Sequence, residues 1–372
     1  MTTPAKPGSP SPSRLASIDA LRGFDMFWIT GGEELIHGLH RTLGSSWTAV
    51  LDTQFHHVAW GGFRFYDLIF PLFMFIVGVV LPFSLTRRLE RGASRGQLYR
   101  HLIQRLILLL LLGLVYNGLL DFQFHDLRVA GVLQRIALGY FFAALVVMNT
   151  NVRGQAIITG AILLGYWAIL MLIPVPGFGA GVLTPQGNLA ACLDQKLLPQ
   201  PFCCYHFGDN EGILSTLPVV ATTLLGALAG HWLRSSATPK RKVVGPAIAG
   251  VACLLVGGLW SLAFPVIKNL WTSSYVLVAG GCSLLLLALF YWIIDVRGWR
   301  RWAFFFTVIG MNAITIYLAR RLFDFGTITA IFVHGFIDYL GPAKPLFWDF
   351  SVLMTGWLFL YFLYRQKIFL KV

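Results

Sequence analysis

FHHVAWGGFRFYDLIFPLFMFIVG, residues 55–78, is the stretch that decides the fold. It opens with two histidines, a tryptophan and two glycines, and Asp67 then stands at the mouth of an apolar run of membrane-spanning length. Titratable side chains at the edge of such a run are costly and mark functional sites by default. We therefore expect His57 and Asp67 to form the chemical centre of a membrane protein.

Both residues have alternative explanations. His57 could be a general base, a nucleophile or a metal ligand, or a structural loop histidine. Asp67 could hold the second imidazole N–H, and it could equally be a helix N-terminal charge favoured by the dipole. Adjacent histidines rarely point at one ion, and the sequence supplies no third ligand for the pair His56–His57. We expect no metal.

Composition places the chain among membrane proteins. Of its 372 residues, 56% are hydrophobic and 12% are charged, with a mean hydropathy of +0.69. A soluble domain carries about a quarter charged residues. The net charge is +13, but Lys and Arg are concentrated in short loops between apolar runs, where they set membrane topology. We therefore expect contact with membrane lipid and none with nucleic acid.

The apolar runs predict an all-α polytopic membrane protein with about ten spanning helices, each of roughly 20 residues. The segment 326–340 is apolar but short, and we expect it to be re-entrant or interfacial. The ten expected spans are 19–39, 65–86, 102–120, 129–149, 154–174, 212–233, 243–264, 270–294, 302–322 and 346–364.

The distribution of basic residues gives the orientation. With ten spans, most Lys and Arg residues fall on the side of both termini, so we expect both termini to be cytoplasmic. The Pro- and Ser-rich residues 1–13 should form a disordered cytoplasmic tail. Residues 14–372 should form a single transmembrane domain with an outer loop at 175–211.

This topology gathers unusual polar residues toward the outer face. An intramembrane arginine such as Arg135 is a functional-site candidate, or else one half of a structural ion pair. Asn312 could line a pocket or hydrogen-bond between helices. The candidate substrate-binding residues obtained in this way are Glu33, Glu34, Gln134, Arg135, Asp209, Glu211, Asn269, Ser274 and Asn312.

The inner face is a cationic rim with few acidic residues. It includes Arg87 and Arg88, and its arginines could simply set topology and contact anionic lipid. Alternatively, they could dock a polyphosphate ligand. The candidate cofactor-binding residues are Arg22, Arg100 and Arg105.

The five cysteines form no metal-binding pattern. Cys192, Cys203 and Cys204 fall in the expected outer loop, where a disulfide is possible. We expect Cys192 to pair with one of the other two, because a bond between adjacent cysteines is strained.

Six sequence blocks, taken together, resemble a known family. The chain is similar to the heparan-α-glucosaminide N-acetyltransferase family of transmembrane acetyltransferases and its bacterial relatives. The blocks are RLASIDALRGFDMFWITGG (14–32), HVAWGGFRFYDLIFPLFMFIVG (57–78), AGVLQRIALGYF (130–141), DNEGILSTLP (209–218), KNLWTSSYV (268–276) and GMNAITIYL (310–318).

The resemblance implies transfer of acetyl from cytosolic acetyl-CoA, across the membrane, to the amine of a terminal glucosamine. The family's catalytic histidine corresponds to His57, which is followed by Trp60 as a further substrate-binding candidate. The family also has an asparagine shortly after the first block, whereas this sequence has Thr30, Glu33 and Glu34 in that region.

The resemblance further implies a homodimer, and we expect a multi-pass protein of the bacterial inner (plasma) membrane. His57 would take a proton from the acceptor amine, or would itself be acetylated. Gln134, Asn269 or Arg135 could stabilise the oxyanion. The alternatives are an amino-sugar permease and an O-acetyltransferase of an envelope glycan.

Overall fold

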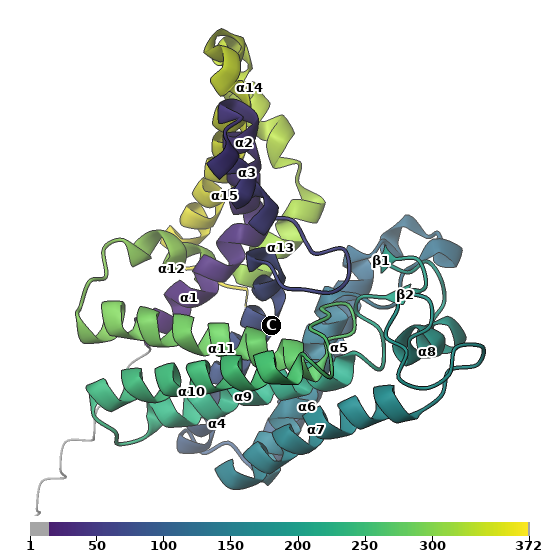
Figure 1. The fold of residues 1–372 in the computed structure, drawn as a ribbon. Coiled ribbons are helices and arrows are strands. Elements are labelled where there is room, and N and C mark those ends of the chain that lie inside the picture. The colour runs from purple at the N-terminus through teal and green to yellow at the C-terminus, as the bar shows by residue number, and fades with distance from the viewer. Residues whose placement is uncertain (1–14, 371–372) are drawn as a thin grey trace, which may run out of the picture.

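The computed structural model describes residues 15–370, and these are almost entirely helical (Figure 1). Within this range, strands occur as one two-stranded antiparallel pair in a loop. The predicted class, an all-α polytopic membrane protein, is confirmed. The tail expected at residues 1–13 lies outside the described residues.

The elements follow one another in this order. The first part contains α1 (Ala16–Phe27), η1 (Trp28–Gly32), α2 (Glu33–Leu43), α3 (Ser46–Gln54), η2 (Phe65–Leu68), α4 (Ile69–Glu90) and α5 (Arg95–Tyr116). The middle contains η3 (Leu119–Asp121), η4 (Phe124–Asp126), α6 (Val132–Asn149), α7 (Val152–Leu172), α8 (Leu189–Leu197), β1 (Cys204–Tyr205), β2 (Gly208–Asp209), α9 (Thr216–Arg234) and α10 (Pro239–Trp260). The last part contains α11 (Ser273–Phe290), η5 (Tyr291–Val296), α12 (Ala303–Met311), α13 (Ala313–Leu322), α14 (Phe325–Ile337), η6 (Asp338–Ala343) and α15 (Lys344–Arg365).

The described residues contain eight helices that are long and apolar enough to cross a membrane, or nine if the bent pair α12–α13 is one span. Nine of the ten expected spans coincide with these segments. The bend between α12 and α13 is 70°, and it falls at Asn312, where the helical backbone is interrupted.

The first expected span, 19–39, is wrong, because the structure does not form it as one continuous helix. Its helix breaks at η1, where Gly31 adopts φ 121°, a conformation that glycine tolerates best. The uninterrupted helix α1 has 12 residues, about 18 Å at 1.5 Å per residue, which is short of a hydrocarbon core of about 30 Å. Hydropathy does not report backbone conformation, so it does not register this break, although the charged residues Glu33 and Glu34 follow it directly.

Helix α4 lies in the core, where it packs against α9, α1, α6 and α11. Its contact with α9 is close enough that a Cβ at Gly78 would collide with the backbone oxygen of Thr223. Small residues permit such close helix approach in membranes, where dispersion contacts hold helices together. This packing fixes α4, and therefore Asp67 just ahead of it.

Helices α2, α3, α14 and α15 form an arm that projects from the helical body (Figure 1). The segment 326–340, predicted to be re-entrant or interfacial, contains α14, a helix of 13 residues. It runs antiparallel to α15, as shown by the ring contacts Phe325–Phe359 and Phe336–Phe347.

The cysteine prediction is wrong. Cys203 is bonded to Cys204, and Cys192 is a free thiol on α8. Cys192 lies on helix α8, whereas Cys203 and Cys204 lie at β1. The three cysteines are close in the sequence, but the fold does not bring the Cys192 sulfur to either of the other two.

Candidate active site at the start of helix α4

His57 and Asp67 meet at the entrance to α4, as the sequence predicted. The imidazole Nδ1 lies 2.8 Å from Oδ1 of Asp67. The Asp67 side chain is fully buried, while that of His57 is 50% exposed. An exposed imidazole supported by a buried carboxylate is a suitable arrangement for proton transfer with a bound ligand.

Local backbone structure holds Asp67 in place. The turn η2 begins directly after Arg64, whose backbone N–H donates to Oδ2 of Asp67 at 3.1 Å. The Tyr275 hydroxyl, from α11, donates to the backbone oxygen of Asp67 at 2.7 Å. The Arg64 guanidinium in turn donates to the backbone oxygen of His57 at 3.1 Å. Both members of the pair are therefore fixed by backbone contacts as well as by each other.

Lys268 is a third member of this site, and sequence reasoning missed it. Its Nζ lies 2.9 Å from Nδ1 and 3.1 Å from Nε2 of His57, and 3.5 Å from Oδ1 of Asp67. Burial lowers the pKa of the Lys268 ammonium, while the Asp67 charge acts in the opposite direction. The available signal was the position of this lysine at the start of the KNLW block, but its partners are not visible in the sequence.

These contacts assign the imidazole tautomer. Since the Asp67 carboxylate can only accept a hydrogen bond, we place the His57 proton on Nδ1, which leaves the lone pair on Nε2; the Lys268 Nζ is nearly equidistant from the two ring nitrogens. Such a site can accept one proton at Nε2 and stabilise the resulting imidazolium through Asp67.

Glu33 and Glu34, both predicted for the outer face, have different surroundings in the structure. Glu33 hydrogen-bonds the Tyr66 side chain, and burial raises the pKa of this glutamate. The Tyr66 ring lies 4.8 Å, centroid to centroid, from the ring of His57, so Glu33 belongs to the surroundings of the histidine. Glu34 instead approaches Arg41 to 3.9 Å and lines a different cavity, beside α13 and α15. Thr30 lies in the region where the family has an asparagine. Its hydroxyl donates to the backbone oxygen of Phe27 at 3.3 Å, so this side chain is hydrogen-bonded within its own helix turn.

Asp209 and Glu211 form ion pairs with Arg128, a residue that the sequence did not single out. Burial would raise the pKa of Asp209, but the hydrogen bond and charge of Arg128 hold this pKa below its usual value. Asp209 also accepts backbone N–H bonds from Cys203 at 3.0 Å and Glu211 at 2.8 Å. Both carboxylate oxygens of Asp209 are thus engaged within the protein, and its role in attracting a substrate ammonium stays a prediction.

Gln134, Arg135 and Glu211 line a cavity of about 720 Å³ whose remaining wall is largely apolar. Arg135 is buried, donates to the Ser215 hydroxyl and stacks 5.1 Å above the Trp271 ring. Both amide atoms of Gln134 are buried and have no hydrogen-bond partner in the described part of the chain. The Nε atom of Arg135 likewise has no partner among the described residues, so both side chains of this cavity lining retain unpaired polar atoms.

The three remaining outer-face candidates have different surroundings. The Trp60 indole donates to the backbone oxygen of Leu183 at 2.8 Å. Ser274 is fully buried, with its hydroxyl 3.1 Å from that of Thr272, so it is not in a position to contact a substrate. Asn269 follows Lys268 in the loop before α11 and is half-buried.

At the opposite end of α4, Arg22 and Arg105, two of the three predicted cofactor-binding residues, line one cavity of about 460 Å³. Arg105 stacks 4.0 Å above the Tyr140 ring. Arg100 is exposed and is not part of this lining, because five residues along α5 turn it to another face.

The structure places Asn312 away from the outer-face residues with which the sequence analysis grouped it. It is buried at the α12–α13 break, and its amide donates to the backbone oxygen of Ile368 at 3.3 Å. Its neighbours Met311 and Ala313 line the same cavity as Arg22 and Arg105. Asn312 therefore belongs to the end of the molecule opposite His57, where it holds the C-terminal segment.

Comparison with known proteins identifies the family of this chain. Residues 14–270 match the family model described as heparan-alpha-glucosaminide N-acetyltransferase, catalytic. The human heparan-alpha-glucosaminide N-acetyltransferase is 28% identical over 420 residues, covering 97% of this chain and 60% of the relative. The mouse protein of the same name is 26% identical over 421 residues, covering 97% and 61%. This chain thus spans about three fifths of the length of these relatives. It belongs to the heparan-α-glucosaminide N-acetyltransferase family.

Proposed function

We propose that this protein is a transmembrane N-acetyltransferase that moves acetyl from cytosolic acetyl-CoA to the amine of a glucosamine-type sugar on the outer side. The observation that carries the proposal is the position of two complementary sites on one helix. The His57–Asp67–Lys268 cluster lies at the start of α4, and the arginine-lined cavity lies toward its other end.

The inner cavity suits a coenzyme with phosphates at one end and a narrow arm at the other. Arg22 and Arg105 would bind the phosphates, since guanidinium groups form paired charge-assisted hydrogen bonds with phosphate oxygens. The α4 side of the cavity runs from Ser84 to Phe73, which is about 16 Å along the helix axis. Phe73 is six residues beyond Asp67, or about 9 Å, so an extended pantetheine arm would bring its thioester toward the site.

The residues at the outer site match the needs of amine acetylation. Nε2 of His57 would take a proton as the amine nitrogen attacks the thioester carbonyl and the C–N bond forms. Asp67 would stabilise the imidazolium, which then returns the proton to the departing thiolate as the C–S bond breaks. A prior transfer of the acetyl group to His57, followed by attack of the amine, uses the same residues.

Two cationic groups are available for the negative charge that develops on the carbonyl oxygen. The Lys268 ammonium already lies at Nε2 of His57, so an oxygen bound beside that nitrogen would contact it. Arg135 lies within electrostatic range of Lys268. Donors directed at a developing oxyanion are worth about 10²–10³-fold in rate.

The test is incubation of the full-length protein in detergent with labelled acetyl-CoA and glucosamine. We expect amine-dependent release of free CoA and a labelled N-acetyl sugar by mass spectrometry. His57→Ala should lower the rate by about 10²–10⁴-fold, whereas His125→Ala, at an exposed loop position, should leave it unchanged. Full activity of His57→Ala would exclude the proposal.

The same assay separates the alternatives. A permease would move labelled glucosamine across a vesicle membrane and leave acetyl-CoA intact. An O-acetyltransferase would also accept N-acetylglucosamine, which has no free amine. We further propose, on the family resemblance, a homodimer in the bacterial inner membrane, with the His57 end of α4 facing outward; light scattering of the detergent-purified protein and labelling in intact cells test these points.

A further inference from the structure

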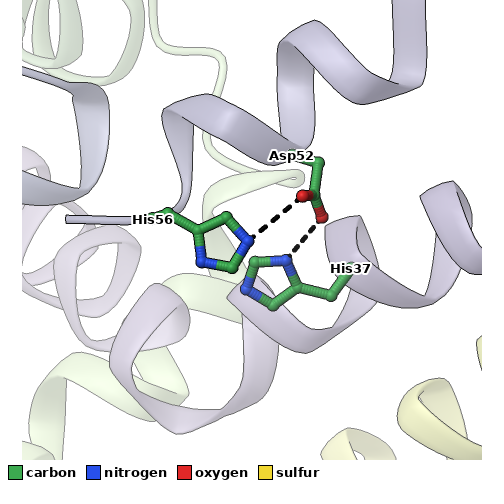
Figure 2. Close-up of side chains that lie close together, drawn as sticks. All are labelled: His37, Asp52 and His56. Carbon is green, nitrogen blue, oxygen red and sulfur yellow. Dashed lines mark hydrogen bonds and ion pairs between the residues drawn. The ribbon is translucent and has the colours of Figure 1, made fainter. Parts of the chain in front are cut away.

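Three side chains converge at the base of the projecting arm (Figure 2). Nδ1 of His37, on α2, lies 2.7 Å from Oδ1 of Asp52, on α3. Nε2 of His56, just beyond α3, lies 3.1 Å from Oδ2 of the same carboxylate. One donor atom from each residue falls within 4.8 Å of the others.

The α2–α3 hairpin explains why residues from three places in the sequence meet. Gly44, with φ 58°, ends α2 and allows the tight reversal into α3. Asp52 lies in the last turn of α3, and the chain turns at Phe55, directly after the helix, which brings His56 back to the Asp52 carboxylate. The His37 and His56 rings are stacked, with centroids 4.5 Å apart, so their nitrogen atoms approach the carboxylate side by side.

We propose that His37, Asp52 and His56 bind a divalent transition-metal ion of the zinc type. Two imidazole nitrogens and one carboxylate are ligands that suit Zn²⁺, whereas Ca²⁺ and Mg²⁺ prefer sets made of oxygen alone. Three protein ligands leave a fourth position for water. Zn–N and Zn–O bonds are about 2.0–2.2 Å long, so two ligand atoms of one tetrahedral ion lie about 3.4 Å apart. An ion would therefore replace the two present hydrogen bonds after each imidazole nitrogen moves slightly away from the carboxylate oxygen that it now contacts, at 2.7 Å and 3.1 Å.

Burial and charge favour a cation at this position. The side chains of His37 and Asp52 are 16% and 19% exposed, which limits competition from solvent, while His56, at 58% exposed, leaves a path of entry. Glu33 and Asp349 lie within electrostatic range of His37. Arg41 offsets part of this negative charge through its 2.7 Å contact with Asp349.

The ion would also position the neighbouring candidate catalytic residue. His56 precedes His57, and the Arg64 guanidinium donates to the backbone oxygens of both, at 3.4 Å and 3.1 Å. Fixing His56 through a metal therefore limits movement of the loop that presents His57. This second effect rests on the proposed acetyltransferase function, whereas metal binding itself does not.

Binding is tested on the full-length protein in detergent after treatment with a chelator. We expect Co²⁺ to produce visible d–d absorption bands at one ion per chain, and Zn²⁺ to abolish them by displacement. His37→Gln, Asp52→Asn and His56→Gln should each weaken binding at least about tenfold. His40→Gln is the matched control, because His40 lies one turn further along α2 and hydrogen-bonds Thr48 instead.

Thermal unfolding gives a second measurement that does not depend on spectra. Zn²⁺ should raise the Tm of the parent and of His40→Gln, because a ligand of the native state stabilises it by mass action. It should not raise the Tm of His56→Gln, whose exposed position makes the substitution mild. Absence of Co²⁺ bands from the parent, or unchanged Co²⁺ affinity in all three ligand variants, would show that the three side chains only hydrogen-bond one another and bind no metal.

A rate measurement separates this inference from the proposed function. If Zn²⁺ binds but no acetyl transfer is found, the metal site stands and the acetyltransferase proposal fails. If acetyl transfer is found and is indifferent to Zn²⁺ that demonstrably binds, the positioning effect on His57 fails and the binding site stands.

Discussion

Lys268 lies 3.1 Å from Nε2 of His57, although 211 residues separate them in the chain. The lysine comes from the loop before α11 and the histidine from the loop before α4, and both loops meet above the same buried carboxylate. This relationship makes the candidate site a cluster of three residues instead of a pair.

Lys268→Met should reduce the catalytic rate by about 10²-fold, because the developing oxyanion would lose a cationic donor. The apparent KM for acetyl-CoA should change little, since the coenzyme phosphates bind at the other end of α4. Steady-state kinetics with varied acetyl-CoA measure both quantities. Lys196→Met, at an exposed position of α8, is the control; equal rates for the two variants would remove Lys268 from the mechanism.

Asp67→Asn should lower kcat by about 10²–10⁴-fold with little change in KM. An amide in place of the carboxylate favours the imidazole tautomer protonated on Nε2, which cannot accept the proton of the amine. The same assay applies, with a pH–rate profile to test whether higher pH restores activity. A kcat within a few fold of the parent would show that Asp67 serves only to begin the helix.

Arg22→Ala and Arg105→Ala should each raise the KM for acetyl-CoA about tenfold or more, because each removes a charge-assisted contact to phosphate of about 1.5–3 kcal/mol. Arg100→Ala should leave KM unchanged, since its side chain lies outside the shared cavity. If Arg100→Ala weakens acetyl-CoA binding as much as Arg22→Ala does, a diffuse inner-face charge would explain the result better than a defined site.

Asp194 should make stability depend on pH. Burial raises its pKa from the usual 3.8 to about 6, so the folded protein binds a proton that the unfolded chain has released. The stabilising contribution is therefore complete below about pH 4 and is lost as pH rises through 6. Tm measured across this window should fall less in Asp194→Asn than in the parent. Asp126→Asn, at an exposed loop position, should behave as the parent, and identical profiles for all three would contradict the prediction.

Gly78→Ala should destabilise the bundle by about 1–3 kcal/mol, the typical effect of overpacking, because its Cβ would meet the backbone oxygen of Thr223 on α9. Gly160→Ala is the matched change, since no atom lies within 4 Å of its added Cβ on α7. That control should be neutral or slightly stabilising, because alanine favours helix more than glycine does. Thermal unfolding in one detergent compares them, and equal Tm values would argue against close α4–α9 packing.

Local properties of the sequence accounted for much of the molecule. Hydropathy summed over contiguous residues located nine of the ten expected spans, and the block around 55–78 placed His57 against Asp67 at the start of α4. Helix direction also put Arg22 and Arg105 at the same membrane face, and the structure places both in the lining of one cavity. These inferences succeeded because each depends on nearby residues or on helix direction alone.

Tertiary structure decided what depends on distant parts of the chain. Helix packing brings Lys268 to His57 and pairs Arg128 with Asp209, and neither contact was visible in the sequence. The break at Gly31 depends on backbone conformation, which hydropathy does not report. The cluster of His37, Asp52 and His56 exists only because the α2–α3 hairpin closes. The sequence by itself determined that this is a membrane protein and at which ends of its helices the polar residues lie, since burial in lipid follows composition. Helix packing decided which charges neutralise one another, because an ion pair forms only between groups that the fold brings within a few ångströms.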